Sequence, residues 1–302
     1  MQKLETEKVR WIDMEQPNAD DLLKIGKEFN LHPLIIEELT TPTLRPKAAQ
    51  YGDSLYLAIH IPLFDVKEKT TFPAEVDIIL TKDSLITSHD KDIFQLTEFF
   101  KELQENEKAR NSIMGKNPGY LLHQLLEMLF ESCFPKLDHI IEKLDKIEEE
   151  IFAGHEKEMV FEISVVKRDI LNFRRTMKPQ KSIIDSLAQR EYGIIDPELK
   201  PYFQDLVGTV IRIWSTLENL KETIESLEGT NNSLLSNRLD MTMKVLTLFS
   251  AIMLPLTVYS NIMSMSTNIP LHTNPSAFWI HASIMFFIAV FTFTIFKLKK
   301  WL

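Results

Sequence analysis

The sequence predicts an α/β cytoplasmic domain, then a long helical stalk, then a two-helix transmembrane hairpin, within 302 residues. Three observations support this fold class. Residues 1–240 hold 30 basic and 43 acidic side chains, a net charge of −13, whereas the last 62 residues hold four lysines and no acid. Two uncharged runs fill residues 245–265 and 278–296. Long helical periodicity begins near residue 118.

Residues 1–110 make up the predicted α/β domain. Short apolar runs predict strands, the last two of which form a hairpin: "VRWID", "SLYLAIHIPLF", "EVDIILT" and "SLITSH". Helices are predicted between them, in "NADDLLKIGKEF", which opens on Asn18 as its N-cap, and in "HPLIIEEL". We therefore expect a compact α/β unit.

Residues 111–244 make up the predicted stalk. Apolar residues recur every three or four positions over residues 119–152 and again over 156–177, as in an antiparallel helix pair. Pro179 is expected to end or kink the second helix. A further helix begins near Pro197 or Pro201 and continues into the first uncharged run, a length on the order of 100 Å. Its apolar face requires partner helices from the same chain or from neighbouring subunits.

Residues 245–302 make up the predicted hairpin. The two uncharged runs, 21 and 19 residues long, can each cross a hydrocarbon core of about 30 Å. The 12 residues between them are too few for a domain, so both ends of the hairpin lie on one side of the membrane. Lysines flank these ends and place them in the cytoplasm by the positive-inside rule: Lys244, Lys297, Lys299 and Lys300. We expect a multi-pass protein of the inner (plasma) membrane with both termini cytoplasmic.

Composition and motifs argue against several other classes of protein. The N-terminus lacks the apolar run of a signal peptide, so nothing there argues for export. Cys133 is the only cysteine, which excludes an internal disulfide and suits a reducing compartment. Strong basic runs are absent from residues 1–240, which argues against a nucleic-acid partner. No constellation of nucleophile and base is visible, so an enzyme anchored by a hairpin is a remote alternative.

A stripe of mostly polar residues follows the first span. At about 100° of rotation per residue, seven positions of this helix fall within an arc of about 120°. They are Asp240, Met243, Ser250, Leu254, Thr257, Asn261 and Ser264. Tyr259 and Ser260 fall outside this arc. Polar groups in hydrocarbon are costly unless they face protein or water, so the stripe predicts an interface or a pore lining. Ser and Thr have the alternative of bonding to their own backbone, but the carboxamide of Asn261 cannot be satisfied by its own turn. Two helices enclose no pore, so we expect several copies in a cyclic oligomer.

Several segments resemble the CorA-type metal ion transporters in order and spacing over nearly the whole chain. They are "RPKAAQYGDSLYLAIHIP", "FPKLDHIIEKLDKIEEEIF", "SLLSNRLDMTMKVLT", "LPLT" and the terminal "KLKKWL". The resemblance implies a funnel-shaped homopentamer whose long helix lines an axial pore. It implies transport of hydrated Mg²⁺, and in some members of Co²⁺, Ni²⁺ or Zn²⁺. It also implies that transport is driven by the membrane potential or, in the zinc branch, by a proton gradient.

The chain departs from this family at the signature Tyr-Gly-Met-Asn, whose Asn ring meets the ion at the outer mouth. Met263, Ser264, Met265 and Ser266 align there, so Ser266 offers a hydroxyl in place of the carboxamide. Asn261 falls where the family usually has glycine, further into the membrane. We hypothesise that the carboxamide ring has moved inward to Asn261, in a pore also lined by Thr257, Ser264, Ser266 and Ser250.

Apolar and acidic pore positions also follow from the resemblance. Met243, Leu246 and Leu254 match the constrictions that gate by dewetting, with ordinary helix packing as the alternative. The family's acidic ring on the stalk aligns with Gly229, and Asp240 would restore a carboxylate ring at the membrane entrance. The outer loop lacks the acidic residues that often concentrate cations there, which weakens electrostatic steering.

Two further sets of residues are candidates for metal or proton binding. The segment "YFQDLVG" resembles the family segment that binds regulatory Mg²⁺ between protomers, which nominates Asp205. Asp90 or Asp92 of the adjoining domain would complete that site, unless these carboxylates are only solvated. His281, in the second span, could carry protons or bind a soft metal, with packing as the alternative.

We therefore expect a divalent metal cation channel or transporter whose partners are its own copies, the lipid bilayer and divalent cations. Mg²⁺ is the default ion, both transported and regulatory, because of the family rather than because of this filter. A zinc or other transition-metal transporter of the zinc branch is the first alternative. A non-conducting regulatory membrane scaffold with a degenerate filter is the second.

Overall fold

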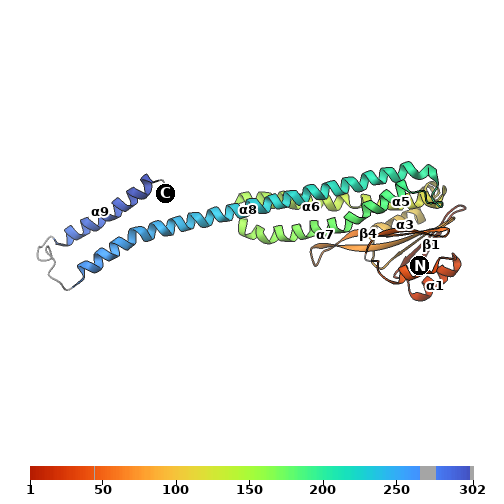
Figure 1. The fold of residues 1–302 in the computed structure, drawn as a ribbon, viewed down its shortest axis with the longest axis horizontal. Coiled ribbons are helices and arrows are strands. Elements are labelled where there is room, and N and C mark those ends of the chain that lie inside the picture. Colours follow the sequence, from red (N-terminus) through yellow and green to blue (C-terminus); the bar gives the residue numbers. More distant parts are fainter. Residues whose placement is uncertain (44, 266–276, 300–302) are drawn as a thin grey trace. The chain divides into compact units, whose positions relative to one another are not determined.

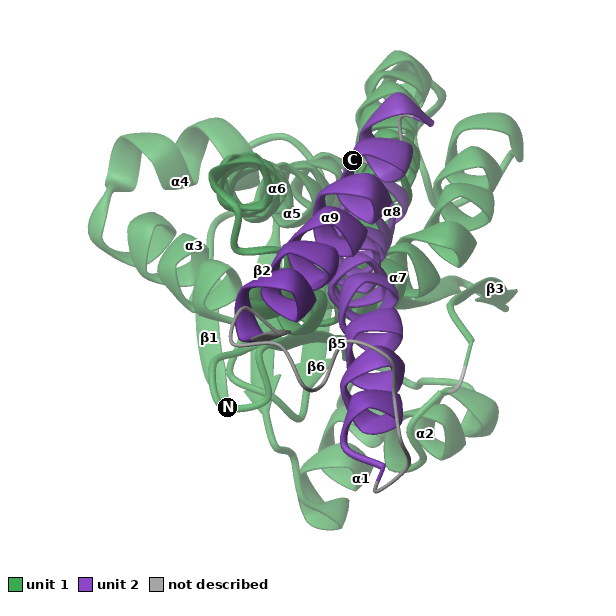
Figure 2. Cartoon of the chain, turned by 90° about the vertical axis from the view of Figure 1, so that its left-hand side faces the viewer, with its two compact units in different colours: residues 1–228 green, residues 229–302 purple. Residues whose placement is uncertain are grey.

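The computed structural model describes residues 1–43, 45–265 and 277–299. The chain forms two compact units, Met1–Glu228 and Gly229–Leu302 (Figure 2). The first unit opens with a mixed α/β layer and continues into long helices, and the second consists of helical segments (Figure 1). The predicted order of α/β domain, long helices and apolar hairpin is confirmed. The domain boundaries at residues 110 and 244 stay a prediction.

A six-stranded mixed sheet forms the core of the first unit. Its order is β1-β2-β6-β5-β4-β3, in which β2 and β6 are parallel and every other pair is antiparallel. The strands are β1 Gln2–Glu5, β2 Arg10–Glu15, β3 Lys47–Tyr51, β4 Ser54–Asp65, β5 Thr70–Leu80 and β6 Ser84–His89. The four predicted strands and the predicted hairpin are confirmed, and the two edge strands β1 and β3 are additional.

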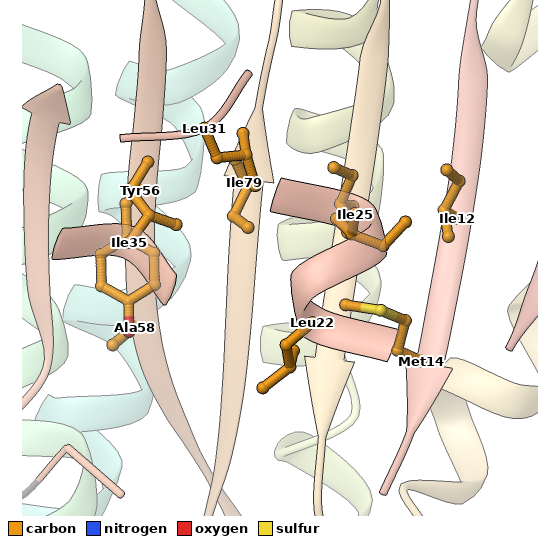
Figure 3. Packing of buried hydrophobic residues seen from close by; sticks show 10 residues of the cluster. Ile12, Met14, Leu22, Ile25, Leu31, Ile35, Tyr56, Ala58 and Ile79 are labelled. Carbon is orange, nitrogen blue, oxygen red and sulfur yellow. The ribbon is translucent and has the colours of Figure 1, made fainter. Parts of the chain in front are cut away.

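Two short helices, α1 (Ala19–Glu28) and α2 (Pro33–Thr40), cover one face of the sheet. Asn18 caps α1 as predicted: its side chain accepts the backbone N–H of Asp21 at 2.9 Å. Figure 3 shows Leu22 and Ile25 of α1 lying over Ile12 and Met14 of β2. All four side chains are nearly inaccessible to solvent, so this apolar layer fixes the helices on the sheet.

The other face packs against helices that come later in the chain. These are α3 (Phe94–Glu105), α5 (Pro118–Glu131) and α7 (Glu156–Gln189), with α4 (Glu107–Met114) beside α3 and α5. Trp11 of β2 contacts Phe99 and Phe100 of α3, with ring centroids 5.6 and 4.9 Å apart. Because both faces are covered, the central strands are buried on both sides, and every residue of β6 is buried.

The long helices continue beyond the sheet. Helix α6 (Phe134–Ala153) ends at Gly154, whose φ of 99° lies in the left-handed region that favours glycine, and α7 then runs back beside α6. Of the two expectations for Pro179, that it ends this helix is wrong, because α7 continues to Gln189; that it kinks the helix stays a prediction. Met177 and Ile184 are buried on either side of Pro179, so tertiary packing offsets the missing backbone hydrogen bond.

Helix α8 (Lys200–Met263) follows a short 3₁₀ turn, Pro197–Leu199. Within the first unit its buried side chains recur every three or four residues: Phe203, Leu206, Val210, Ile213, Leu217, Leu220, Ile224 and Leu227. Charged pairs join it to α7, where Arg174 bonds to Glu218 and Lys167 Nζ lies 2.6 Å from Glu228 Oε2. This part of α8 is therefore an ordinary packed helix with an apolar stripe.

A buried polar pair lies within the sheet. Tyr56 Oη donates to Asp77 Oδ1 at 2.5 Å, on the face covered by α1 and α2. Burial raises the pKa of Asp77 to about 7, and Glu75, Asp90 and Glu38 add to this effect, although the Tyr56 hydrogen bond acts in the opposite direction. The folded protein therefore holds a proton on Asp77 that the unfolded chain releases at lower pH.

We expect this carboxyl to make the protein less stable as pH rises from about 4 to about 7. In that window the unfolded chain has lost the proton and the folded chain keeps it, so the contribution falls by up to about 1.4 kcal/mol per pH unit. Asp77→Asn should remove this slope, measured by thermal melting of the full chain in detergent from pH 5 to 8. An unchanged slope, matching that of Asp138→Asn at an exposed position on α6, would contradict the assignment.

Candidate functional site

The candidate site follows α8 through the second unit. Asp240, Ser250, Thr257, Asn261 and Ser264 are all exposed in the single chain. The three apolar candidates are exposed as well, with Met243 at 59%, Leu246 at 55% and Leu254 at 66%. Exposed apolar surface on this scale requires lipid or further protein to cover it. Helix α9 (Ala277–Leu298) is the second apolar helix, and both helices are long and apolar enough to cross a membrane.

A hydrogen bond between the two membrane helices fixes which side of α8 faces α9. Tyr259 Oη of α8 lies 2.7 Å from His281 Nδ1 of α9, with ring centroids 6.0 Å apart. Thr257 and Asn261 each lie two residues from Tyr259, which is about 200° around the helix. The polar face that these two residues form therefore points away from α9 and toward whatever surrounds the hairpin.

The hydroxyl groups on this face bond to their own helix. Thr257 Oγ1 donates to the carbonyl of Met253 and Ser264 Oγ to that of Ser260, both at 2.8 Å. Because each hydroxyl has one proton, the oxygen keeps only acceptor lone pairs for other partners. Thr292 and Thr294 of α9 bond in the same way, so back-bonding alone does not distinguish a pore lining from packing. Asn261 lacks this local solution, which makes it the more informative residue.

Pro255 lies within α8 between Ser250 and Thr257, two of the candidate pore residues. It has no N–H, so the carbonyl of Ala251 receives no helical hydrogen bond from position i+4. A groove of about 410 Å³ lies on this stretch, lined by Leu246, Thr247, Ser250, Ala251, Leu254 and Pro255. The hydroxyls of Thr247 and Ser250 and the carbonyl of Ala251 therefore lie on the same stretch of α8 as the apolar gate candidates Leu246 and Leu254.

The candidate regulatory carboxylates lie in the first unit. Asp205 is exposed near the start of α8, close to His123 of α5. Burial lowers the pKa of His123, and Glu127, the Tyr202 carbonyl and Asp205 partly offset that effect. Asp90 and Asp92 follow β6 and are exposed. Among the described residues, one chain brings together no group of three or more His, Cys, Asp or Glu side chains suited to a metal. The site at these residues therefore stays a prediction.

Sequence reasoning did not pair Tyr259 with His281. Two signals were available: Tyr259 falls outside the polar arc, and His281 is a polar residue in an otherwise apolar span. Ser266, the counterpart of the family's filter Asn, lies outside the described residues.

The chain therefore combines an α/β unit with two helices that are long and apolar enough to cross a membrane, one of which carries an exposed polar face. A family model described as "CorA-like Mg2+ transporter protein" matches residues 6–300. The chain belongs to this family and is a divalent metal cation transporter, so the resemblance inferred from the sequence is confirmed.

Individual relatives agree with this family. The chain is 28% identical over 299 residues to the cobalt/magnesium transport protein CorA of Thermotoga maritima, covering 97% of this chain and 83% of that protein. It is 25% identical to the putative metal ion transporter YfjQ of Bacillus subtilis, covering 85% and 78% of the two chains. The structure of the CorA magnesium transporter from Methanocaldococcus jannaschii matches the fold with a TM-score of 0.87 at 20% identity, over 100% of this chain and 95% of that one.

Proposed function

We propose that the protein is a homopentameric channel for divalent cations in the inner (plasma) membrane, with Mg²⁺ as its main ion. Its axial pore would be lined by α8. The observation that carries this proposal is the polar face of Thr257 and Asn261, which the Tyr259–His281 bond turns away from α9. Five copies arranged around an axis would bring these faces together around water, where exposed hydroxyls and carboxamides are stable. Transport of this kind requires no catalytic group, so we do not propose an enzyme.

The choice of ion rests on the relatives' names and on ligand chemistry. Magnesium and cobalt occur together in the name of the Thermotoga relative, and zinc is not favoured. Asn261, Thr257 and Ser264 offer oxygen acceptors, which suit the water shell of a hard cation such as Mg²⁺. Asn261 would supply the carboxamide ring, Ser250 and Ser266 further hydroxyls, and Met243, Leu246 and Leu254 an apolar gate. Asp240 would form a carboxylate ring at the cytoplasmic entrance.

Ion flux into liposomes tests this proposal. We expect the reconstituted full chain to admit Mg²⁺, and Asn261→Ala to lower that flux roughly 10-fold, because each subunit loses a hydrogen bond to the hydrated ion. Thr292→Val, which removes a hydroxyl from α9, is the control and should behave as the unaltered chain. Should Asn261→Ala leave flux unchanged while Ser266→Ala abolishes it, the ring has not moved inward. Inserted pentamers that pass no divalent ion would favour a non-conducting scaffold.

Regulatory Mg²⁺ binding at Asp205, with Asp90 or Asp92 of a neighbouring protomer, is the second part of the proposal. Mg²⁺ bound there would offset the repulsion between acidic surfaces and hold the assembly closed at high internal Mg²⁺. Ligand that binds only the folded assembly stabilises it by about 2.7 kcal/mol at a concentration 100 times its Kd. We therefore expect Mg²⁺ to raise the melting temperature of the full chain and Asp205→Asn to reduce this rise. Glu222→Gln, an exposed position on the same helix, should not; an equal reduction in both variants would contradict the site.

The proposed topology places the first unit and both termini in the cytoplasm. Cys133 is fully buried, and burial raises the pKa of its thiol to about 12, so the native cysteine should not react with maleimide. Glu149→Cys on α6 should therefore be labelled by an impermeant maleimide only after the membrane is opened. His272→Cys, between the spans, should be labelled in intact cells. The reverse labelling pattern would show that the protein has the opposite orientation in the membrane.

A further inference from the structure

The bond between Tyr259 and His281 is more than a generic helix contact, because of where it falls on α8. Tyr259 lies four residues after Pro255 and four residues before the end of the helix at Met263. Both rings are half-buried between α8 and α9, and the two polar atoms are 2.7 Å apart. Within a membrane, neither side chain of such a pair can bond to water instead, so the hydrogen bond helps to hold the two helices together.

The segment of α8 after Pro255 is short and lacks one of the backbone hydrogen bonds that join it to the rest of the helix. Pro255 removes the backbone hydrogen bond to Ala251, which weakens the helical ladder at that point. Beyond it only residues 256–263 remain, about two turns of helix. This segment carries Thr257 and Asn261. A bond from Tyr259 to a separate helix therefore has an unusually direct influence on how the segment is rotated.

The direction of that influence follows from helix geometry. Tyr259 lies about 200° from both Thr257 and Asn261, so holding Tyr259 against α9 holds the polar face on the opposite side. A rotation of the segment by one residue, about 100°, would move the Asn261 carboxamide to the side of the helix. The hydroxyls of Thr257 and Ser264 do not resist such a rotation, because their hydrogen bonds stay within the helix.

We propose that Tyr259 and His281 are positioning residues for ion selection, because their hydrogen bond sets the rotation of the segment that carries Thr257 and Asn261. The proposal rests on the proposed function, since it assumes that these two residues face a shared pore. It adds that the discrimination between ions depends on α9, which does not line the pore. Neither Tyr259 nor His281 touches the ion.

The ratio of Mg²⁺ to Co²⁺ flux in liposomes containing the full chain tests this proposal. Tyr259→Phe removes only the hydroxyl and His281→Leu removes the ring nitrogens. Each should change the flux ratio roughly 3-fold to 10-fold, the range expected from one interhelical hydrogen bond. The double variant should change it no further, because both substitutions remove the same bond. His281→Asn places an amide near the position of Nδ1 and should keep the ratio within about 2-fold of the unaltered chain.

The controls separate selection from stability and from the proposed function. Thr292→Val on α9 should leave the flux ratio unchanged, and every variant should give assemblies of the same size. If Asn261→Ala alters flux while Tyr259→Phe leaves the ratio unchanged, the positioning role is wrong and the proposed function stands. If the effects of the two single substitutions on the flux ratio add fully in the double variant, the two residues act independently. The claim that they act through one shared hydrogen bond is then wrong. An unaltered chain that passes neither ion overturns the proposed function, and the positioning role with it.

Discussion

The fate of polar groups in hydrocarbon is the constraint on which the rest of this structure depends. A lipid environment offers no hydrogen bonds, so each polar side chain in a span needs a partner in protein or water. The hairpin satisfies this requirement in two ways that one chain can supply. Hydroxyls return to their own carbonyls, as at Thr257, and Tyr259 reaches His281 on the other helix. The carboxamide of Asn261 cannot be satisfied by its own helical turn, so we expect its partners to come from beyond that turn.

The same helix meets two different surroundings along its length. Up to Leu227, side chains of α8 are buried at helical spacing in the first unit. From Leu239 onward, most of its large apolar side chains are exposed in the single chain, as at Met243, Leu254 and Ile262. The change coincides with the end of the first compact unit at Glu228. A helix that is apolar and uncovered on this scale is stable only beside lipid or other copies, which links the fold to assembly.

Sequence reasoning reached most of this fold because the informative signals are local. The strands β4, β5 and β6 each contain an apolar stretch, and two uncharged runs define the spans. The edge strands β1 and β3 could not be predicted in the same way, since "QKLE" and "KAAQY" have few β-branched or aromatic residues and gain their structure by pairing with a neighbour. Helix α3 begins at Phe94, and the residue at its N-cap position, Ile93, supplies no side-chain cap, so no start signal was available.

Part of the candidate site could likewise be predicted from local sequence, and part of it depends on residues that are far apart in the chain. Rotation along one helix predicts a polar arc, and Tyr259 and Ser260 then appear as exceptions. Assigning Tyr259 to His281 requires the register of α8 against α9, which depends on packing across residues far apart in the chain. Once that register is known, the position of Tyr259 outside the polar arc is explained. Tyr259 faces α9 and bonds to His281, so the arc on the opposite side of α8 faces away from α9. The carboxylates Asp205, Asp90 and Asp92 remain predictions for a related reason, since a metal site shared between protomers would leave no complete set of ligands within one.

The proposed pore also has to let water past its apolar section. Met243, Leu246 and Leu254 would dewet a narrow passage if nothing polar lay between them. Ser250 lies on the same side of the helix, and Pro255 leaves the carbonyl of Ala251 without its helical donor next to the same groove. In such a pore these oxygens would give water hydrogen-bonding partners beside the apolar residues that oppose wetting. A small change in the width of the section would then decide whether it is wet or dry. In this pore, Leu254 would set the barrier, Ser250 and Ala251 would keep it low enough to cross, and Asn261 would meet the hydrated ion before it arrives there.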